Sequence, residues 1–226
     1  MYRVPFECSS LDNVLEGGVE SSCVTMFYGA AGTGKTNLCL VLARNVALQG
    51  KKVVYLDTEG VSMDRFRQVC GGETQRVLKS VLFFEASSFD EQEKMVDKAI
   101  KLAEGNLDVG MIVVDSITMF YRLTSREEEK SERRSLTSES VKLLGVARKR
   151  DIPVVITSQV FTDIETGNFE ALGGHALHHN AKTIAFVERL GPGRRKLTIM
   201  KHRHIAEGAS ADFKLVNEGI VCEAKS

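Results

Sequence analysis

The stretch Gly29-Ala30-Ala31-Gly32-Thr33-Gly34-Lys35-Thr36 matches the pattern G-x-x-x-x-G-K-[ST] in full. The apolar run Val24–Tyr28 precedes it and is typical of a buried strand, and residues 35–49 follow with apolar side chains at helical spacing. Between a strand and a helix, small residues let successive backbone N–H groups turn toward a phosphate, and the helix dipole favours the bound negative charge. The sequence therefore predicts a phosphate-binding loop, and a chance glycine-rich turn is the alternative.

Three side chains near this loop have predicted roles with ATP and Mg²⁺. Lys35 is expected to reach the β- and γ-phosphates, and the Thr36 hydroxyl to ligate Mg²⁺. Asp115 ends the apolar run 111–114, and a carboxylate at the tip of a buried strand suits a second Mg²⁺ contact made through water. The alternative for Asp115 is a strand-ending carboxylate that caps the next turn.

Further apolar runs alternate with helical patterns, which is typical of βαβ units and a parallel sheet. The predicted strands after the first are 53–57, 81–85, 111–115 and 153–158, and the predicted helices are 35–49, 88–104 and 136–149. Residues 183–190 and 194–200 read as an antiparallel hairpin, with another over 213–222. We therefore expect an α/β fold with a mixed sheet.

The bulk composition fits one globular unit without extreme charge. Lys+Arg and Asp+Glu both number 30, so net charge does not predict nucleic-acid binding, which would have to come from local patches. The five cysteines include no CxxC pair and are odd in number, which argues against a disulfide framework and favours a reducing compartment such as the cytoplasm. No apolar run approaches the roughly 18 residues of a membrane span, and the N-terminus lacks a signal-peptide pattern.

Two polar residues just past strand tips suggest hydrolysis. Glu59 follows the strand 53–57 and could polarise a water beside the γ-phosphate. Gln159 follows the strand 153–158 and could detect the γ-phosphate and pass that state to the next loop. A turn glutamate and a surface amide are the alternatives.

These segments resemble the RecA/RadA recombinase family, in the family's order: G-A-A-G-T-G-K-T (29–36), Y-L-D-T-E-G (55–60), I-V-V-D-S (112–116) and V-I-T-S-Q-V (155–160). The resemblance covers 6–220 and implies a RecA-like P-loop NTPase core, with a mostly parallel central sheet and antiparallel C-terminal strands flanked by helices. It implies that Glu59 is the catalytic glutamate, Gln159 the γ-phosphate sensor and Lys35 a catalytic cation. Arg65 matches, after a one-residue gap, an arginine that stacks on adenine, and a solvated helix arginine is its alternative.

The resemblance also implies DNA binding, single-stranded DNA being the expected form. The family's two DNA loops would fall at 121–135 and 161–172, and the second is acidic here, which predicts weak strand binding. A later basic cluster is the better candidate, with exposed hairpin ends as the alternative. The predicted DNA-binding residues are Arg194, Arg195, Lys196, Lys201, His202, Arg203, Arg133 and Arg134.

The predicted function is that of an ATP- and DNA-binding accessory protein of recombination and repair, with weak ATPase activity, that assists the RadA recombinase. The phosphate-binding loop starts close to the N-terminus, so we expect a single core domain over 1–226 without the N-terminal helical domain of full-length relatives. A homodimer is left open. The alternatives are a nucleotide-gated binding module without useful hydrolysis and a KaiC-like ATPase acting on protein. A zinc site at His175, His178 and His179 is a weaker alternative.

Overall fold

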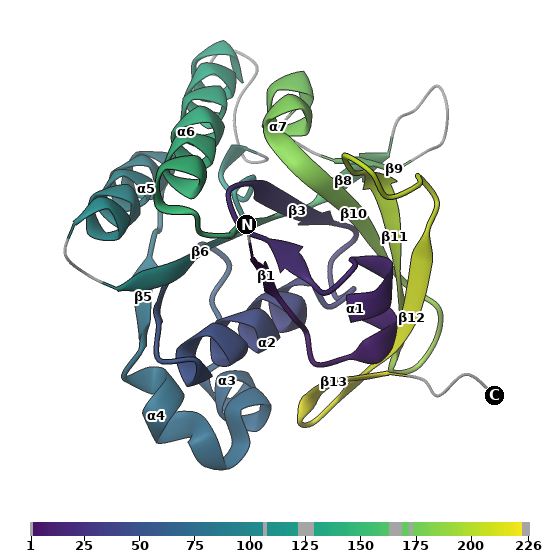
Figure 1. Ribbon diagram of the computed structural model, residues 1–226. Coiled ribbons are helices and arrows are strands. Elements are labelled where there is room, and N and C mark those ends of the chain that lie inside the picture. Colours follow the sequence, from purple (N-terminus) through teal and green to yellow (C-terminus); the bar gives the residue numbers. More distant parts are fainter. Residues whose placement is uncertain (1, 106–107, 122–128, 163–168, 172–173, 223–226) are drawn as a thin grey trace.

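The computed structural model describes residues 2–105, 108–121, 129–162, 169–171 and 174–222 (Figure 1). A nine-stranded sheet crosses the molecule in the order β13-β12-β11-β10-β3-β7-β6-β4-β5, and two further pairs are β1–β2 and β8–β9. The strands are β1 (Arg3–Val4), β2 (Val19–Glu20), β3 (Val24–Tyr28), β4 (Lys52–Asp57), β5 (Val81–Glu85), β6 (Val109–Asp115), β7 (Val154–Ser158), β8 (Val160–Thr162), β9 (Phe169–Ala171), β10 (Ala181–Arg189), β11 (Arg194–Lys201), β12 (Ser210–Val216) and β13 (Gly219–Cys222). Strands β10, β3, β7, β6, β4 and β5 run parallel, and β11 to β13 are antiparallel.

Helices cover both faces of the sheet (Figure 1). The helices are α1 (Ser9–Val14), α2 (Lys35–Leu48), α3 (Met63–Cys70), α4 (Thr74–Leu78), α5 (Phe89–Glu104), α6 (Glu129–Arg150) and α7 (Gly174–Asn180), with a 3-10 turn at Gly71–Glu73. One apolar cluster joins α1, α2, α3 and α4 to the sheet, and a second joins α5, α6 and α7 to its other face. The chain is therefore a three-layer α/β/α structure.

Alternation along the central strand β3 shows why both faces need a helical layer. Val24 and Met26 contribute to the α5–α6 cluster, whereas Phe27 contributes to the α2 cluster. All five residues of β3 are buried, as expected for a parallel strand covered on both sides. Hydrophobic burial on both faces fixes the position of β3 between the two helical layers, and it thereby fixes where the following loop begins.

The predicted fold class is confirmed, including the mixed sheet and the parallel order of its central strands. The helix α5 begins at its predicted cap, since the Ser88 hydroxyl accepts a hydrogen bond from the Glu91 N–H. The main departure is α6, which begins at Glu129 rather than near Leu136. Its first turns are polar and charged, so they carry no apolar periodicity from which a helix could be predicted.

The cysteines do not all behave as the small core residues expected. Cys8 and Cys222 form a disulfide that joins the segment before α1 to the end of β13, while Cys23, Cys39 and Cys70 are free and buried. Because 214 positions separate the bonded pair, its spacing gave no sign of the bond. The described helices include none long and apolar enough to cross a membrane.

A buried acid–amide pair joins α5 to α6. The Gln92 amide nitrogen donates to one oxygen of Glu139 (2.8 Å) and to the Ile117 carbonyl (3.1 Å), and the Gln92 amide oxygen and the other Glu139 oxygen are buried without a partner. Burial raises the pKa of Glu139 to about 8. A proton on that second Glu139 oxygen would let it donate to the Gln92 amide oxygen, which would satisfy both unpartnered atoms at once.

We predict that Glu139→Gln flattens the dependence of folding stability on pH. The folded-state pKa of Glu139 lies above its ordinary value of 4.5. Protonation of Glu139 therefore contributes its full share of folding stability below pH 4.5, and that share is lost as the pH rises toward 8. The variant places an amide where wild type has a carboxyl group, and the amide cannot ionise. Above pH 8 the variant should therefore be more stable than wild type, by roughly 1–3 kcal/mol. Urea unfolding between pH 5 and 9 measures this, with exposed Glu207→Gln as the control. Parallel pH profiles for wild type and Glu139→Gln would contradict the assignment.

Candidate functional site

The predicted phosphate-binding loop lies between β3 and α2, with close packing on its outer side. A Cβ atom on Gly29 would lie 2.2 Å from the Val187 carbonyl oxygen of β10, and a backbone atom cannot move aside to relieve that clash. Gly34, at φ 103°, is the N-cap of α2, and a Cβ there would meet the Leu215 side chain of β12 at 2.9 Å. The glycines therefore permit both the left-handed turn and the close approach of the C-terminal strands.

Hydrogen bonds hold the shape of this loop. The Thr33 hydroxyl donates to the Ala30 carbonyl (2.9 Å), and the Lys35 ammonium donates to the carbonyls of Gly29 (2.8 Å) and Ala30 (3.0 Å). Burial lowers the pKa of Lys35, and nearby Glu59 and Asp115 oppose that effect. The loop is thus ordered around a desolvated cation, while Ala30, Ala31 and Gly32 stay exposed to a ligand.

Asp115 is a buried carboxylate at the end of β6. Tyr55 donates to one of its oxygens (2.8 Å) and Thr157 to the other, and Thr36 also hydrogen-bonds to it. Burial raises the pKa of Asp115 although these hydrogen bonds oppose the shift. A desolvated carboxylate beside a hydroxyl is an oxygen donor set of the kind that Mg²⁺ prefers, so Asp115 and Thr36 fit the predicted cation.

The catalytic glutamate and the sensor predicted from the sequence lie together. The Gln159 side-chain amide donates to the Glu59 carboxylate at 2.8 Å, which joins the loop after β4 to the loop after β7. Asp57 holds the Glu59 loop by accepting hydrogen bonds from the N–H groups of residues 59 to 61. Since β4, β6, β7 and β3 are parallel neighbours, their carboxyl ends bring these groups to one edge of the sheet.

Arg65 lies in the first turn of α3, and its guanidinium is anchored rather than solvated. It donates to the Asn37 side chain on α2 and to the carbonyls of Val216 (2.8 Å) and Asn217 (2.9 Å) at the β12–β13 turn. Arg65 therefore links the helix behind the phosphate loop to the C-terminal hairpin. Its stacking on adenine stays a prediction.

The predicted DNA-binding residues form two groups rather than one patch. Residues 133, 134 and 194 to 196 lie toward the carboxyl edge of the sheet, because α6 follows β6 and β11 begins after β10. Lys201, His202 and Arg203 lie at the other end of β11, about 24 Å away for an eight-residue strand. Arg133 and Arg134 are exposed, but residues 122–128, 163–168 and 172 of the two predicted DNA loops lie outside the described residues.

Partners within the chain occupy the second group. The Lys201 ammonium donates to the carbonyls of His178 and Ala181 (2.9 Å), at the end of α7. Arg203 (2.8 Å) and Arg3 (2.9 Å) both contact the buried carboxylate of Glu20. These bonds stabilise the β1–β2 ribbon and α7, so DNA phosphates would compete with them at this end of β11.

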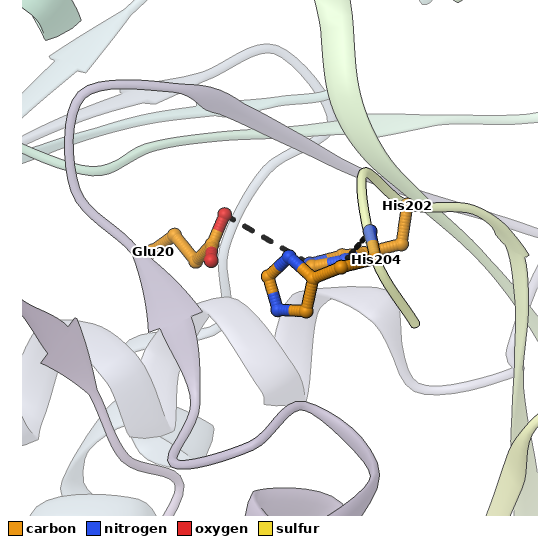
Figure 2. A group of neighbouring side chains, drawn as sticks. All are labelled: Glu20, His202 and His204. Carbon is orange, nitrogen blue, oxygen red and sulfur yellow. Dashed lines mark hydrogen bonds and ion pairs between the residues drawn. The ribbon is translucent and has the colours of Figure 1, made fainter. Parts of the chain in front are cut away.

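Glu20, His202 and His204 converge as metal ligands can, with ligand atoms within 4.8 Å of one another (Figure 2). The backbone N–H groups of His204 (3.3 Å) and Ile205 (3.2 Å) donate to His202 Nδ1. In the neutral ring of His202 the proton then sits on Nε2, the atom that faces Glu20 at 3.8 Å, so no lone pair of His202 points at the centre of the group. With two guanidinium groups also on Glu20, the geometry favours an ion network over a metal.

Within the zinc alternative predicted at three other histidines, His178 and His179 are exposed, and the side chain of His175 lies outside the described residues.

Two residues of the site carried no role in the sequence analysis, and a third, Arg195, was predicted to bind DNA instead. Tyr55 and Thr157 orient Asp115, and Arg195 donates to the Gly32 carbonyl of the phosphate loop at 3.2 Å. Tyr55 and Thr157 lie inside the quoted motifs on the strands flanking β6, where side chains on one face must meet. Arg195 gave a misleading signal, because its two basic neighbours suggested an exposed cluster, whereas it is 8% exposed.

Comparisons with known proteins agree with this architecture. A profile of the Rad51 family matches residues 2–223. The chain belongs to the Rad51 family. The DNA repair and recombination protein RadB of Methanococcoides burtonii is 42% identical over 215 residues, which are 94% of this chain and 95% of that protein. RadB of Archaeoglobus fulgidus is 42% identical over 219 residues, 96% of this chain and 97% of that protein.

A solved structure gives the same result for the fold of this Rad51-family chain. A crystal structure of the RadB recombinase matches with a TM-score of 0.82 at 31% identity and covers 98% of this chain and 100% of the solved one. The RecA-like fold is thereby confirmed, and the likeness to RadB extends over nearly the whole length of both chains. ATP with Mg²⁺ is general to RecA-like recombinases, and the buried oxygen donors at Asp115 and Thr36 fit that pair.

We predict that Asp115→Asn removes the Mg²⁺-dependent part of ATP affinity. The amide keeps the shape of the side chain but loses the charge that attracts the cation, so ATP binding in Mg²⁺ should weaken by roughly tenfold or more. Calorimetric titration of ATP, with Mg²⁺ and with EDTA, measures this. Glu85→Gln, an exposed carboxylate at the end of β5, two strands from β6 in the sheet, is the matched control. Equal Mg²⁺ dependence in Asp115→Asn and wild type would contradict the role.

Proposed function

We propose that this chain is an ATP- and DNA-binding accessory protein of homologous recombination and DNA repair, with slow ATPase activity, that assists a RadA recombinase. The observation that carries the proposal is the convergence of Lys35, Asp115, Glu59 and Gln159 on one edge of the sheet, beside the phosphate loop. The names of the RadB relatives, which describe DNA repair and recombination, support the biological setting.

Hydrolysis would use these residues in separate roles. The loop amides and Lys35 would hold the β- and γ-phosphates, with Thr36 and Asp115 holding Mg²⁺, which supplies charge neutralisation for phosphoryl transfer. Glu59 would orient the attacking water and accept its proton. Gln159 donates to Glu59 at 2.8 Å, so a γ-phosphate would compete with Glu59 for this amide. That competition links nucleotide state to the loop that follows β7.

Slow turnover is expected for two reasons. The Glu59 carboxylate is held by the Gln159 amide at 2.8 Å, so that hydrogen bond must be exchanged before Glu59 can orient a water. In addition, a lone subunit lacks the groups that a neighbouring subunit supplies in a filament, as the resemblance to recombinases implies. ATP binding would therefore matter more to the protein's action than rapid hydrolysis.

We predict that Glu59→Gln lowers the turnover of ATP at least tenfold and leaves ATP affinity within about twofold of wild type, because the amide cannot accept the proton from water. Single-turnover hydrolysis and equilibrium binding, each with and without single-stranded DNA, separate the two effects. Equal, negligible rates in both proteins would favour the alternative, a nucleotide-gated binding module without useful hydrolysis.

For DNA, we favour the cations at the carboxyl edge of the sheet. Arg133 and Arg134 are exposed near the start of α6, and Arg194 and Lys196 begin β11 on the same edge as the phosphate loop. Asp212 contacts Arg194 at 3.5 Å, so the local positive charge is partly offset. Contacts at this edge would lie near the nucleotide, and weak, salt-sensitive binding is expected.

We predict that Arg133→Ala/Arg134→Ala reduces the salt dependence of single-stranded DNA binding, lowering the log–log slope by about 0.7 for each DNA phosphate that the arginines no longer neutralise. Fluorescence anisotropy of labelled DNA from 25 to 300 mM salt, with ATP, with ADP and without nucleotide, measures the slope. The control is Arg148→Ala/Arg150→Ala, at the opposite end of the same helix. Unchanged slopes would contradict this assignment, and no DNA affinity in any state would favour a KaiC-like ATPase that acts on protein.

The remaining parts of the proposal concern setting and assembly. A single RecA-like core over 1–226 would act on chromosomal DNA in the cytoplasm, with RadA as its protein partner and a homodimer as one open arrangement. The shares of chain covered in the RadB comparisons, 94% to 97% on both sides, support a core of this size.

A further inference from the structure

Arg195 is a buried cation whose side chain reaches the phosphate loop. It lies on β11 opposite Arg189 of β10 and Phe213 of β12, and only 8% of it is exposed. One terminal nitrogen donates to the Gly32 carbonyl at 3.2 Å, and the other donates to the carbonyls of Gly191 (3.3 Å) and Arg194 (2.8 Å). The guanidinium thus spans from its own hairpin turn to the loop after β3.

The charge of this guanidinium has no counterpart in the described chain. All of its described hydrogen-bond acceptors are neutral carbonyls, no described carboxylate lies within ion-pair distance, and its Nε atom is buried without a partner. Burial, together with the like charge of Arg189 on β10, lowers the pKa of Arg195. A desolvated cation of this kind destabilises a fold unless an anion compensates it.

The place of Arg195 identifies the class of anion. Gly32 belongs to the exposed part of the loop that is shaped for phosphate, and Arg195 is the residue of β11 that contacts it. The contact fixes the Gly32 carbonyl and with it the plane of the Gly32–Thr33 peptide, whose N–H donates to the Ala30 carbonyl within the loop (3.4 Å). Positive charge behind such a cradle also strengthens its attraction for a polyphosphate.

We propose that Arg195 is a positioning residue of the nucleotide site, which fixes the phosphate loop through Gly32 and whose unpaired charge is compensated by the phosphates of a bound nucleotide. This inference rests on the proposed nucleotide-binding function and deepens it. It also separates Arg195 from its neighbours Arg194 and Lys196, which stand among the proposed DNA contacts.

The test compares Arg195→Gln and Arg195→Lys with wild type, and uses Lys214→Gln, an exposed cation on the adjacent strand β12, as the matched control. Calorimetry gives the affinities for ATP, ADP and inorganic pyrophosphate, and thermal melting without ligand gives the stability of each protein. For Arg195→Gln we expect affinities for all three phosphates to fall roughly 10- to 100-fold, the size of effect associated with removing a charge-assisted interaction. Its melting temperature without ligand should equal or exceed that of wild type, because an uncompensated charge has been removed.

The control variants distinguish a role of Arg195 in phosphate binding from a structural role. Arg195→Lys should recover part of the missing affinity, since it restores the charge without the forked donors, and Lys214→Gln should bind all three phosphates as wild type does. A ligand-free Arg195→Gln that melts clearly below wild type would mark the guanidinium as a structural residue and overturn the inference. Unchanged phosphate affinities, with or without weaker DNA binding, would overturn it as well. Failure of wild type itself to bind any of the three phosphates would instead overturn the proposed function.

Discussion

The central constraint in this structure is the cost of keeping charges out of water at the carboxyl edge of the parallel sheet. Lys35 and Asp115 are both buried there, with pKa values shifted by burial toward their neutral forms. Each is tolerated because polar groups surround it, loop carbonyls for Lys35 and hydroxyls for Asp115. A site of this kind is better suited to a bound anion and cation than to water, and the preorganisation of the loop follows from that requirement.

Much of this site was accessible from the sequence, and the physical reason is topological. Parallel strands place their carboxyl ends on one edge, so Asp115, Glu59 and Gln159 had to converge once their strands were recognised as neighbours. The apolar strands were also recognisable, because burial on both faces leaves runs without polar interruptions. The start of α6 was not, since its first turns are charged and their helical state depends on the surrounding structure.

The basic residues show where sequence reasoning fails. Position along the chain gave Arg194, Arg195 and Lys196 one shared character, yet alternation along β11 buries the middle residue and leaves its neighbours closer to solvent. Likewise, Lys201 and Arg203 belong to a run of basic residues in the sequence. In the structure, however, Lys201 donates to a backbone carbonyl and Arg203 forms an ion pair with Glu20. Charge can be read from a sequence, whereas the partners of a charge depend on contacts between distant segments. Arg203 and Glu20, which are 183 positions apart, are one such pair.

The antiparallel C-terminal strands are more than an extension of the sheet, because they contact the predicted phosphate loop at two points and α3 at a third. Leu215 closes over Gly34, the turn after β12 accepts hydrogen bonds from Arg65, and Arg195 holds Gly32. The same strands are joined to the N-terminal segment by the Cys8–Cys222 disulfide and by the Ser10 hydroxyl, which donates to the Asp212 carbonyl (2.8 Å). A shift of the phosphate loop would therefore be resisted by a continuous network that reaches both ends of the described chain. Such a network provides a physical route by which nucleotide binding could alter the surface formed by β11 and β12, the strands that carry Arg194 and Lys196.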